Sequence, residues 1–335
     1  MSHCSNYLRW CAIIKIYIII LKCKFQDNFN YIINPTSQIG LPVILLKGHQ
    51  DGPTVYVGAA LHGNELNGIG VILKMLDSIQ ANDLRGKLLF IPIQNPIAFQ
   101  HKRQFIPGDI YDAPQGDPYA AFPGSATGQL AERIAYAILQ AVSCADCAVD
   151  LHTNKAGYNF VDHTFCFFSG NPVADRAREL ARIFGTPLVT DVQSGLWVAD
   201  SLFHEATNKR GIPTFGAELG EGGFIQPDSV DVGYSGMMNV LRHLGMLNGK
   251  VTKNLDQIVV NTIIPVRASA GGILKHSVQL GAQVRDGDEI AKVYDLHLKE
   301  IERVKSPATG VVHGQKTYPT VNSGERVCVI GVPKA

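Results

Sequence analysis

Short apolar runs typical of β-strands alternate with amphipathic helical segments between residues 41 and 244, and this alternation strongly constrains the fold. Strands are predicted at Leu41–Leu46, Thr54–Ala60, Gly86–Pro92, Ala148–Leu151, Thr164–Phe168, Pro187–Val189 and Pro213–Leu219. Helices are predicted at Asn67–Ile79, Ala126–Val142, Val173–Phe184, Ser201–Arg210 and Val230–Leu244. Strands that alternate with helices form mostly parallel sheets with helices on both faces. The chain is therefore predicted to be an α/β protein.

The pattern changes near Gly249–Asp256, and beyond it short strands and glycine turns replace the long helical periods. A chain of 335 residues is also long for one core. We therefore expect three regions: an N-terminal extension or extra strand over 1–35, an α/β domain over 36–250, and a small all-β domain over 256–335.

The N-terminal region contains the apolar run Cys11–Leu21, which includes Lys15. A membrane-spanning helix needs about 20 apolar residues, so this run is too short. No small-residue cleavage site follows it, which argues against a signal peptide. Its Ile and Tyr content favours a strand packed on the main domain, and no membrane partner is expected.

Charge and cysteine content exclude some classes of function. The 30 basic residues nearly balance the 29 acidic ones, so no nucleic-acid partner is indicated. The seven cysteines are an odd number scattered through apolar surroundings, as in reduced cytoplasmic proteins.

Metal-binding side chains follow two of the predicted strands. His62 and Glu65 form an H-x-x-E turn after Thr54–Ala60, and His152 follows Ala148–Leu151. Carboxyl ends of parallel strands meet at one edge of a sheet, where ligands bind. Two histidines and one carboxylate are the three protein ligands of a catalytic zinc site with an open fourth position.

Further motifs occur in a fixed order along the chain. They are His62-Gly63-Asn64-Glu65, Asn95-Pro96-x-Ala98-Phe99 with Arg103 and Pro107, Phe122-Pro123-Gly124, Asp150-Leu151-His152-Thr153 and Ala217-Glu218-Leu219-Gly220. The set resembles the succinylglutamate desuccinylase/aspartoacylase family of zinc amidohydrolases over about residues 40–332. An ordered set is far more specific than any single motif. The resemblance implies a zinc-carboxypeptidase-like mixed sheet, mostly parallel, followed by the all-β domain.

The resemblance also implies roles for individual residues. His62, Glu65 and His152 would bind one Zn²⁺ per chain, Glu218 would act as general base, and Arg103 would polarise the scissile carbonyl. From the residues alone, Glu218 could instead be a strand-end carboxylate held by backbone amides, and Arg103 a solvated charge. The all-β domain would pack over the site rim or mediate oligomerisation, and we expect a homo-oligomer.

One loop departs from the family pattern. Where the family has Asn-Arg, which binds a substrate carboxylate, this chain has Tyr119-Ala120. Alanine cannot replace an arginine fork. Either another cation takes over or the substrate has no carboxylate there; the candidate cations are Arg210, Lys155 and Lys102. Tyr119 and Asn154 are predicted to contact the substrate, and acidic loop residues would tolerate a basic or neutral substrate; these are Asp109, Asp112 and Asp117.

Three other motifs are given structural interpretations. Cys144 and Cys147 have redox spacing but no second pair, which favours buried thiols. The glycine-rich run after Glu218 indicates an active-site rim. Lys299 falls near the carrier position of a lipoyl-like domain, but its neighbours Leu298 and Glu300 argue against lipoylation.

We therefore predict a cytoplasmic zinc amidohydrolase that cleaves the linear amide of a small N-acylated amino acid or amine. A metallocarboxypeptidase acting on short peptides is the alternative enzyme, although it too needs a carboxylate clamp. A non-catalytic metal-bearing binding protein is the third reading, against which the presence of Glu218 argues.

Overall fold

The computed structural model describes residues 30–34, 37–107, 116–167, 170–192 and 209–333, together with residues 202 and 206. The strand expected within Cys11–Leu21 lies outside these residues, and so does most of the helix expected at Ser201–Arg210. Strands β1 (Asn30–Asn34) and β2 (Ser37–Gly40) form a small antiparallel pair.

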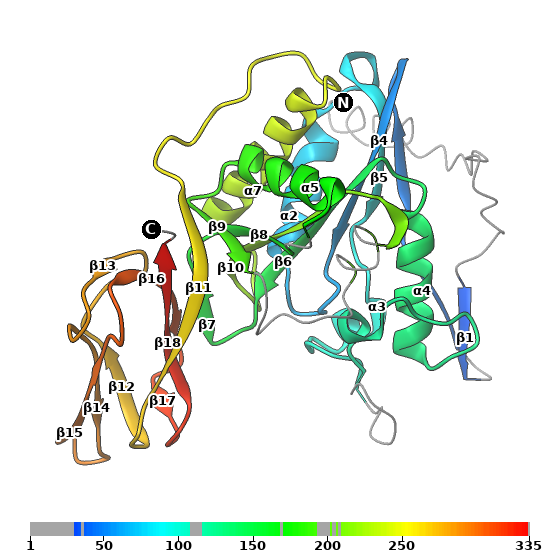
Figure 1. The fold of residues 1–335 in the computed structure, drawn as a ribbon. Helices are drawn as coiled ribbons and strands as arrows, with labels where there is room; N and C mark the ends of the chain where they lie inside the picture. The colour runs from blue at the N-terminus through cyan, green and yellow to red at the C-terminus, as the bar shows by residue number, and fades with distance from the viewer. Residues whose placement is uncertain are drawn as a thin grey trace, which may run out of the picture.

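A mixed, mostly parallel sheet forms the centre of the molecule (Figure 1). In spatial order its strands are β9 (Leu188–Val192), β8 (His163–Phe167), β10 (Thr214–Glu221), β6 (Cys147–Asn154), β4 (Gln50–Ala59), β5 (Arg85–Ile91) and β3 (Ile44–Lys47). Only the β8–β10 and β3–β5 pairs among these are antiparallel. The predicted α/β class is confirmed.

Helices cover both faces of this sheet (Figure 1). One face carries α2 (Asn67–Ser78), α5 (Pro172–Phe184) and α7 (Pro227–His243), and their apolar side chains join Val57, Leu151 and Phe215 in one buried cluster. The other face carries α4 (Leu130–Val142), whose Ile134 and Ile138 pack with Tyr56 and Leu89. Full burial of one large apolar side chain contributes about 1.5–3 kcal/mol to folding, so both faces contribute to stability.

The helix predicted at Ala126–Val142 begins later than expected, at Leu130. Glu132 explains this start, because its Oε2 accepts a hydrogen bond from the backbone nitrogen of Gln129 at 2.7 Å. A carboxylate at the third helical position satisfies a backbone donor that the helix itself leaves free. The remaining short helical segments are η1 (Ala81–Asp83), α3 (Pro96–Gln100) and η2 (Pro118–Ala121).

Every described element after α7 is a β-strand. Strands β11 (Ile258–Arg267), β18 (Arg326–Pro333), β16 (Gly310–Lys316) and β13 (Gln283–Val284) extend the central sheet, and β7 (Tyr158–Phe160) pairs with β16. The extension is continuous because β11 runs parallel to β9 and is hydrogen-bonded to it. A second antiparallel sheet contains β15 (Glu300–Lys305), β14 (Glu289–Tyr294), β12 (Gly272–His276) and β17 (Thr320–Val321). No helix within the described part of the chain is long and apolar enough to cross a membrane.

Strands β4, β6 and β10 lie side by side and parallel, which determines where a site can form. Gly58 in β4 is opposite Asp150 in β6, and His152 in β6 is opposite Glu218 in β10. The residues that follow these three strands therefore emerge at the same edge of the sheet.

Candidate active site

The turn that carries His62 and Glu65 is shaped by two small residues. Ala60, directly after β4, has a positive φ of 50°, a conformation that costs free energy for any residue except glycine. Gly63 lies against α3, and a Cβ there would be 2.0 Å from the backbone carbon of Ala98. The backbone nitrogen of Gly63 also donates to the carbonyl of Gln104 at 3.3 Å. The turn is thus fixed from both sides.

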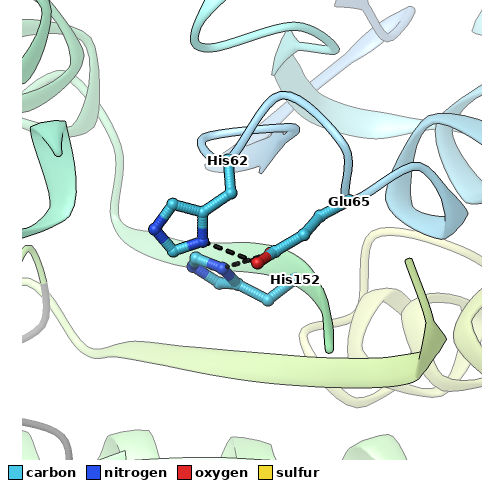
Figure 2. A group of neighbouring side chains, drawn as sticks. All are labelled: His62, Glu65 and His152. Atoms are coloured by element: carbon cyan, nitrogen blue, oxygen red, sulfur yellow. Dashed lines mark hydrogen bonds and ion pairs between the residues drawn. The ribbon is translucent and has the colours of Figure 1, made fainter. Parts of the chain in front are cut away.

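Figure 2 shows His62, Glu65 and His152 converging from this turn and from β6. His62 Nδ1 lies 2.7 Å from Glu65 Oε1, and His152 Nδ1 lies 3.0 Å from Glu65 Oε2. The backbone nitrogen of Thr153 also donates to Glu65 Oε2, at 3.2 Å. One potential ligand atom from each of the three residues lies within 4.8 Å of the others.

Each histidine has an aspartate at its other ring nitrogen. His62 Nε2 is 3.3 Å from Asp117 Oδ1, and His152 Nε2 is 3.0 Å from Asp150 Oδ2. A carboxylate at Nε2 holds the ring with Nδ1 toward the centre of the site, which is the arrangement seen around metal-binding histidines.

Two further buried polar side chains hold the aspartate beside His152. Asp150 Oδ1 accepts a hydrogen bond from Gln94 Nε2 at 2.5 Å, and the hydroxyl of Tyr56 donates to Gln94 Oε1 at 3.0 Å. Asp150, Gln94 and Tyr56 are fully buried. Their hydrogen bonds therefore form a fixed support for the His152 ring.

The electrostatics favour a cation at the centre of the site. Burial by itself would lower the pKa of His62, but Glu65 and Asp117 outweigh it and raise that pKa to about 10. Burial would likewise raise the pKa of Glu65, yet the two histidines lower it to about 2. Both imidazoles direct Nδ1 toward Glu65. A divalent metal bound between the three residues would take the place of the protons on these two nitrogens.

The half-buried Glu218 supplies a further carboxylate beside this cluster. Burial, followed by repulsion from Glu65, raises the pKa of Glu218 to about 7. Its Oε2 has no hydrogen-bond partner among the described residues. A buried carboxylate oxygen without a partner is costly and commonly has a functional role.

The donor set fits zinc by its chemistry. Two imidazole nitrogens and one carboxylate oxygen are zinc's usual ligands in hydrolytic sites, and three protein ligands leave a coordination position for water or substrate. The unpartnered oxygen of Glu218 is a further polar group that such a water could satisfy.

The other predicted site residues are placed as follows. The ring centroid of Tyr119 is 5.7 Å from that of His152 and 6.1 Å from that of His62. Asn154 is buried at the end of β6, where its Nδ2 donates to the carbonyl of Gly220 at 3.4 Å. The Arg103 side chain is exposed, one residue before Gln104, whose carbonyl accepts a hydrogen bond from the backbone nitrogen of Gly63.

Sequence reasoning assigned no role to four polar residues of the site: Tyr56, Gln94, Asp117 in its contact with His62, and Asp150. Asp150 could have been found from its spacing, because residues two apart on a strand point to the same face. Asp117 is 55 residues from His62 in the sequence, so no local pattern connects them.

Comparison with known proteins agrees with this geometry. The family model of the succinylglutamate desuccinylase/aspartoacylase catalytic domain matches residues 51–244. The N-alpha-acetyl-L-2,4-diaminobutyric acid deacetylase of Halomonas elongata is 29% identical over 304 residues, which are 87% of this chain and 85% of that protein.

Solved structures show the same architecture. A succinylglutamate desuccinylase from Silicibacter sp. TM1040 superposes with a TM-score of 0.78 at 23% identity, covering 89% of this chain and 90% of the other. The product-bound ectoine utilization protein EutE (DoeB) from Ruegeria pomeroyi gives 0.77 at 25% identity, covering 88% and 90%.

The fold and the family match define the class as hydrolases of amide bonds other than peptide bonds. Within that class, the chain belongs to the succinylglutamate desuccinylase/aspartoacylase family.

Proposed function

We propose that this protein is a zinc-dependent deacylase that hydrolyses the amide of a small Nα-acylated amino acid. The observation that carries the proposal is the Glu218 carboxylate beside the His62–Glu65–His152 cluster, because its buried Oε2 atom has no hydrogen-bond partner among the described residues. A protein that only bound a metal would have no use for such a carboxylate, whereas a hydrolase needs a base there.

His62, Glu65 and His152 would hold the zinc ion. Bound there, zinc would acidify a water molecule, whose pKa can fall from about 15.7 to about 7, and polarise the scissile carbonyl. Asp150 and Asp117 would keep both imidazoles oriented with Nδ1 inward.

Glu218 would accept the proton of the attacking water and pass it to the leaving amine. Such proton transfer by a positioned side chain contributes about 10²–10⁴-fold in rate. Arg103 is proposed to stabilise the oxyanion, which requires its exposed side chain to turn toward the site when substrate binds. Tyr119, next to both histidine rings, would cover the acyl group and exclude water.

Nα-acetyl-L-2,4-diaminobutyrate is the first substrate to test. The 29%-identical relative is named for its deacetylation, and the site loop that lacks the usual arginine carries Asp117, which suits a substrate with an ammonium group. The same loop makes N-acyl aspartates and glutamates poorer candidates.

The test is amine release by zinc-loaded protein from a panel of N-acetyl and N-succinyl amino acids and from blocked peptides. Glu218→Gln removes the base and should abolish release, whereas Asp231→Asn, an exposed carboxylate on α7, should leave it unchanged. Release of C-terminal residues from peptides would favour a carboxypeptidase instead. No release from any compound, with zinc bound, would contradict the proposal.

A further inference from the structure

Three cationic side chains surround one aromatic ring where β7 meets the C-terminal strands. Lys155 Nζ lies 4.9 Å from the ring centroid of Tyr158, Lys316 Nζ lies 5.2 Å from it, and the Arg326 guanidinium carbon lies 4.7 Å from it. A positive charge over an aromatic face is stabilised by the ring quadrupole, more strongly when it is desolvated.

The cluster carries more positive than negative charge. Lys316 is paired with Glu325 at 2.6 Å, and the hydroxyl of Tyr158 donates to the carbonyl of Arg326 at 2.9 Å. Lys155 and Arg326 have no ion pair with any residue in the described part of the chain. Burial, followed by repulsion from Arg326 and Lys316, lowers the pKa of Lys155. A bound anion would relieve this repulsion.

Hydrogen bonds attach the loop that carries Lys155 to the active site. Lys155 follows His152 by three residues, so about 10 Å of extended chain at most separates their Cα atoms. The carbonyl of Asn154 accepts from the backbone nitrogen of Gly222 at 2.6 Å. The next nitrogen, of Gly223, donates at 2.8 Å to the carbonyl of Asn64, which lies between His62 and Glu65 in the turn.

We propose that Lys155, with Arg326 beside it, binds the carboxylate of the N-acyl amino acid substrate. These cations take over from the arginine that is replaced by Ala120, and they bring a residue of the C-terminal strands into substrate recognition. The Lys155 ammonium and the Arg326 guanidinium both lie over the Tyr158 ring, so the ring holds the two cations together beside the loop that follows β6. This proposal rests on the proposed deacylase function for the identity of the ligand.

A binding experiment tests this proposal independently of catalytic turnover. Nα-acetyl-L-2,4-diaminobutyrate and its carboxamide, which lacks only the carboxylate charge, are titrated calorimetrically into zinc-loaded Glu218→Gln protein. The carboxylate compound should bind more tightly, and Lys155→Met should weaken it about tenfold or more, the value of one charge-assisted hydrogen bond. Affinity for the carboxamide should change less than about twofold.

Two variants are controls. Lys155→Arg keeps the charge and should retain most of the preference for the carboxylate, which a merely structural role of Lys155 would not predict. Lys275→Met removes an exposed lysine from β12 and should change neither affinity.

Equal binding of both compounds, loss of both in Lys155→Met, or binding of neither would overturn the assignment of Lys155. The deacylase proposal fails on a different result, namely tight and carboxylate-selective binding without amine release by the protein that retains Glu218.

Discussion

Glu218 differs from the other carboxylates of the site because its side chain forms no ion pair with any residue in the described part of the chain. Glu65 lies between two histidines and Asp150 lies against His152 and Gln94, whereas the Oε2 atom of Glu218 is buried without a partner in the described structure. An unpartnered buried carboxylate destabilises the folded protein, and proteins retain such groups where activity requires them.

This cost gives a prediction for the metal-free protein. An unfolded carboxyl ionises near pH 4.5, whereas Glu218 in the folded protein ionises near pH 7. The folded protein therefore holds the proton through this window, and the free energy of unfolding falls as the pH rises from about 4.5 to about 7. Glu218→Gln removes this loss, so thermal denaturation at pH 8 should show a variant more stable by roughly 2–4 kcal/mol. A less stable variant would contradict the burial of an ionised Glu218.

Asp150 allows a test of the support behind His152. Asp150→Asn keeps the shape of the side chain but removes the negative charge at His152 Nε2. Zinc affinity, measured by competition with a chromogenic chelator, should fall about 10–100-fold. Asp146→Asn, which changes a carboxylate at the start of the same β-strand region, is the matched control and should leave zinc affinity unchanged.

The sequence predicted the residues at strand ends better than those on loops. His62, Glu65 and His152 could be grouped because parallel strands place their carboxyl ends together, and the structure does bring them together. Asp117 could not, because it is 55 residues from His62 in the sequence and its contact with that ring depends on tertiary packing rather than on a local period.

At the level of elements, the turn that carries His62 and Glu65 depends on its contact with α3. Gly63 leaves room for the backbone of Ala98 and Phe99, which a Cβ would approach to 2.0 Å and 2.1 Å. Neither backbone atom can move as a flexible side chain would, so any larger residue must displace the turn or the helix.

Gly63→Ala should therefore weaken both folding and metal binding. Overpacking of this kind costs about 1–3 kcal/mol of stability, and displacement of His62 and Glu65 should lower zinc affinity as well. Gly271→Ala is the milder control, because its added Cβ would come no closer than 3.3 Å to a backbone atom, a contact that a shift of a few tenths of an ångström relieves. Urea denaturation and chelator competition measure the two effects, and full zinc affinity in Gly63→Ala would show that the turn can move freely.

Element types were predictable from apolar periodicity, whereas some boundaries were not. The strands that became β4, β6 and β10 were predicted because continuous runs of apolar residues indicate strands buried on both faces. The late start of α4 was missed because the Glu132 side chain, rather than the apolar pattern, determines it.

On the scale of the whole molecule, a buried pair of histidines joins the α/β part to the C-terminal strands. The ring centroids of His163 in β8 and His313 in β16 are 4.4 Å apart, and both side chains are buried. Neither ring nitrogen of His313 has a hydrogen-bond partner among the described residues. A protonated His313 would therefore be a buried charge without a partner, whereas His163 Nδ1 donates to the carbonyl of Val161 at 2.9 Å.

This pair predicts acid sensitivity. Burial lowers the pKa of His163 to about 4 and that of His313 well below its usual value. The unfolded chain binds protons near pH 6.5 and the folded one does not, so the free energy of unfolding falls as the pH drops from about 6.5 toward 4. His313→Leu should reduce this fall by about 1–2 kcal/mol between pH 6.5 and 5, measured by urea denaturation. His49→Leu, at an exposed position, should leave the fall unchanged.

The parallel pairing of β9 with β11 has a consequence for whether the α/β part and the C-terminal strands can be encoded separately. A chain that ended near residue 250 would leave the β9 edge without its partner and would expose Leu188, which packs with Val260 and Val311. Unpaired strand edges promote self-association. A chain that contains only the α/β part would therefore tend to aggregate. We accordingly expect the α/β part and the C-terminal strands to occur together in one gene rather than as exchangeable modules.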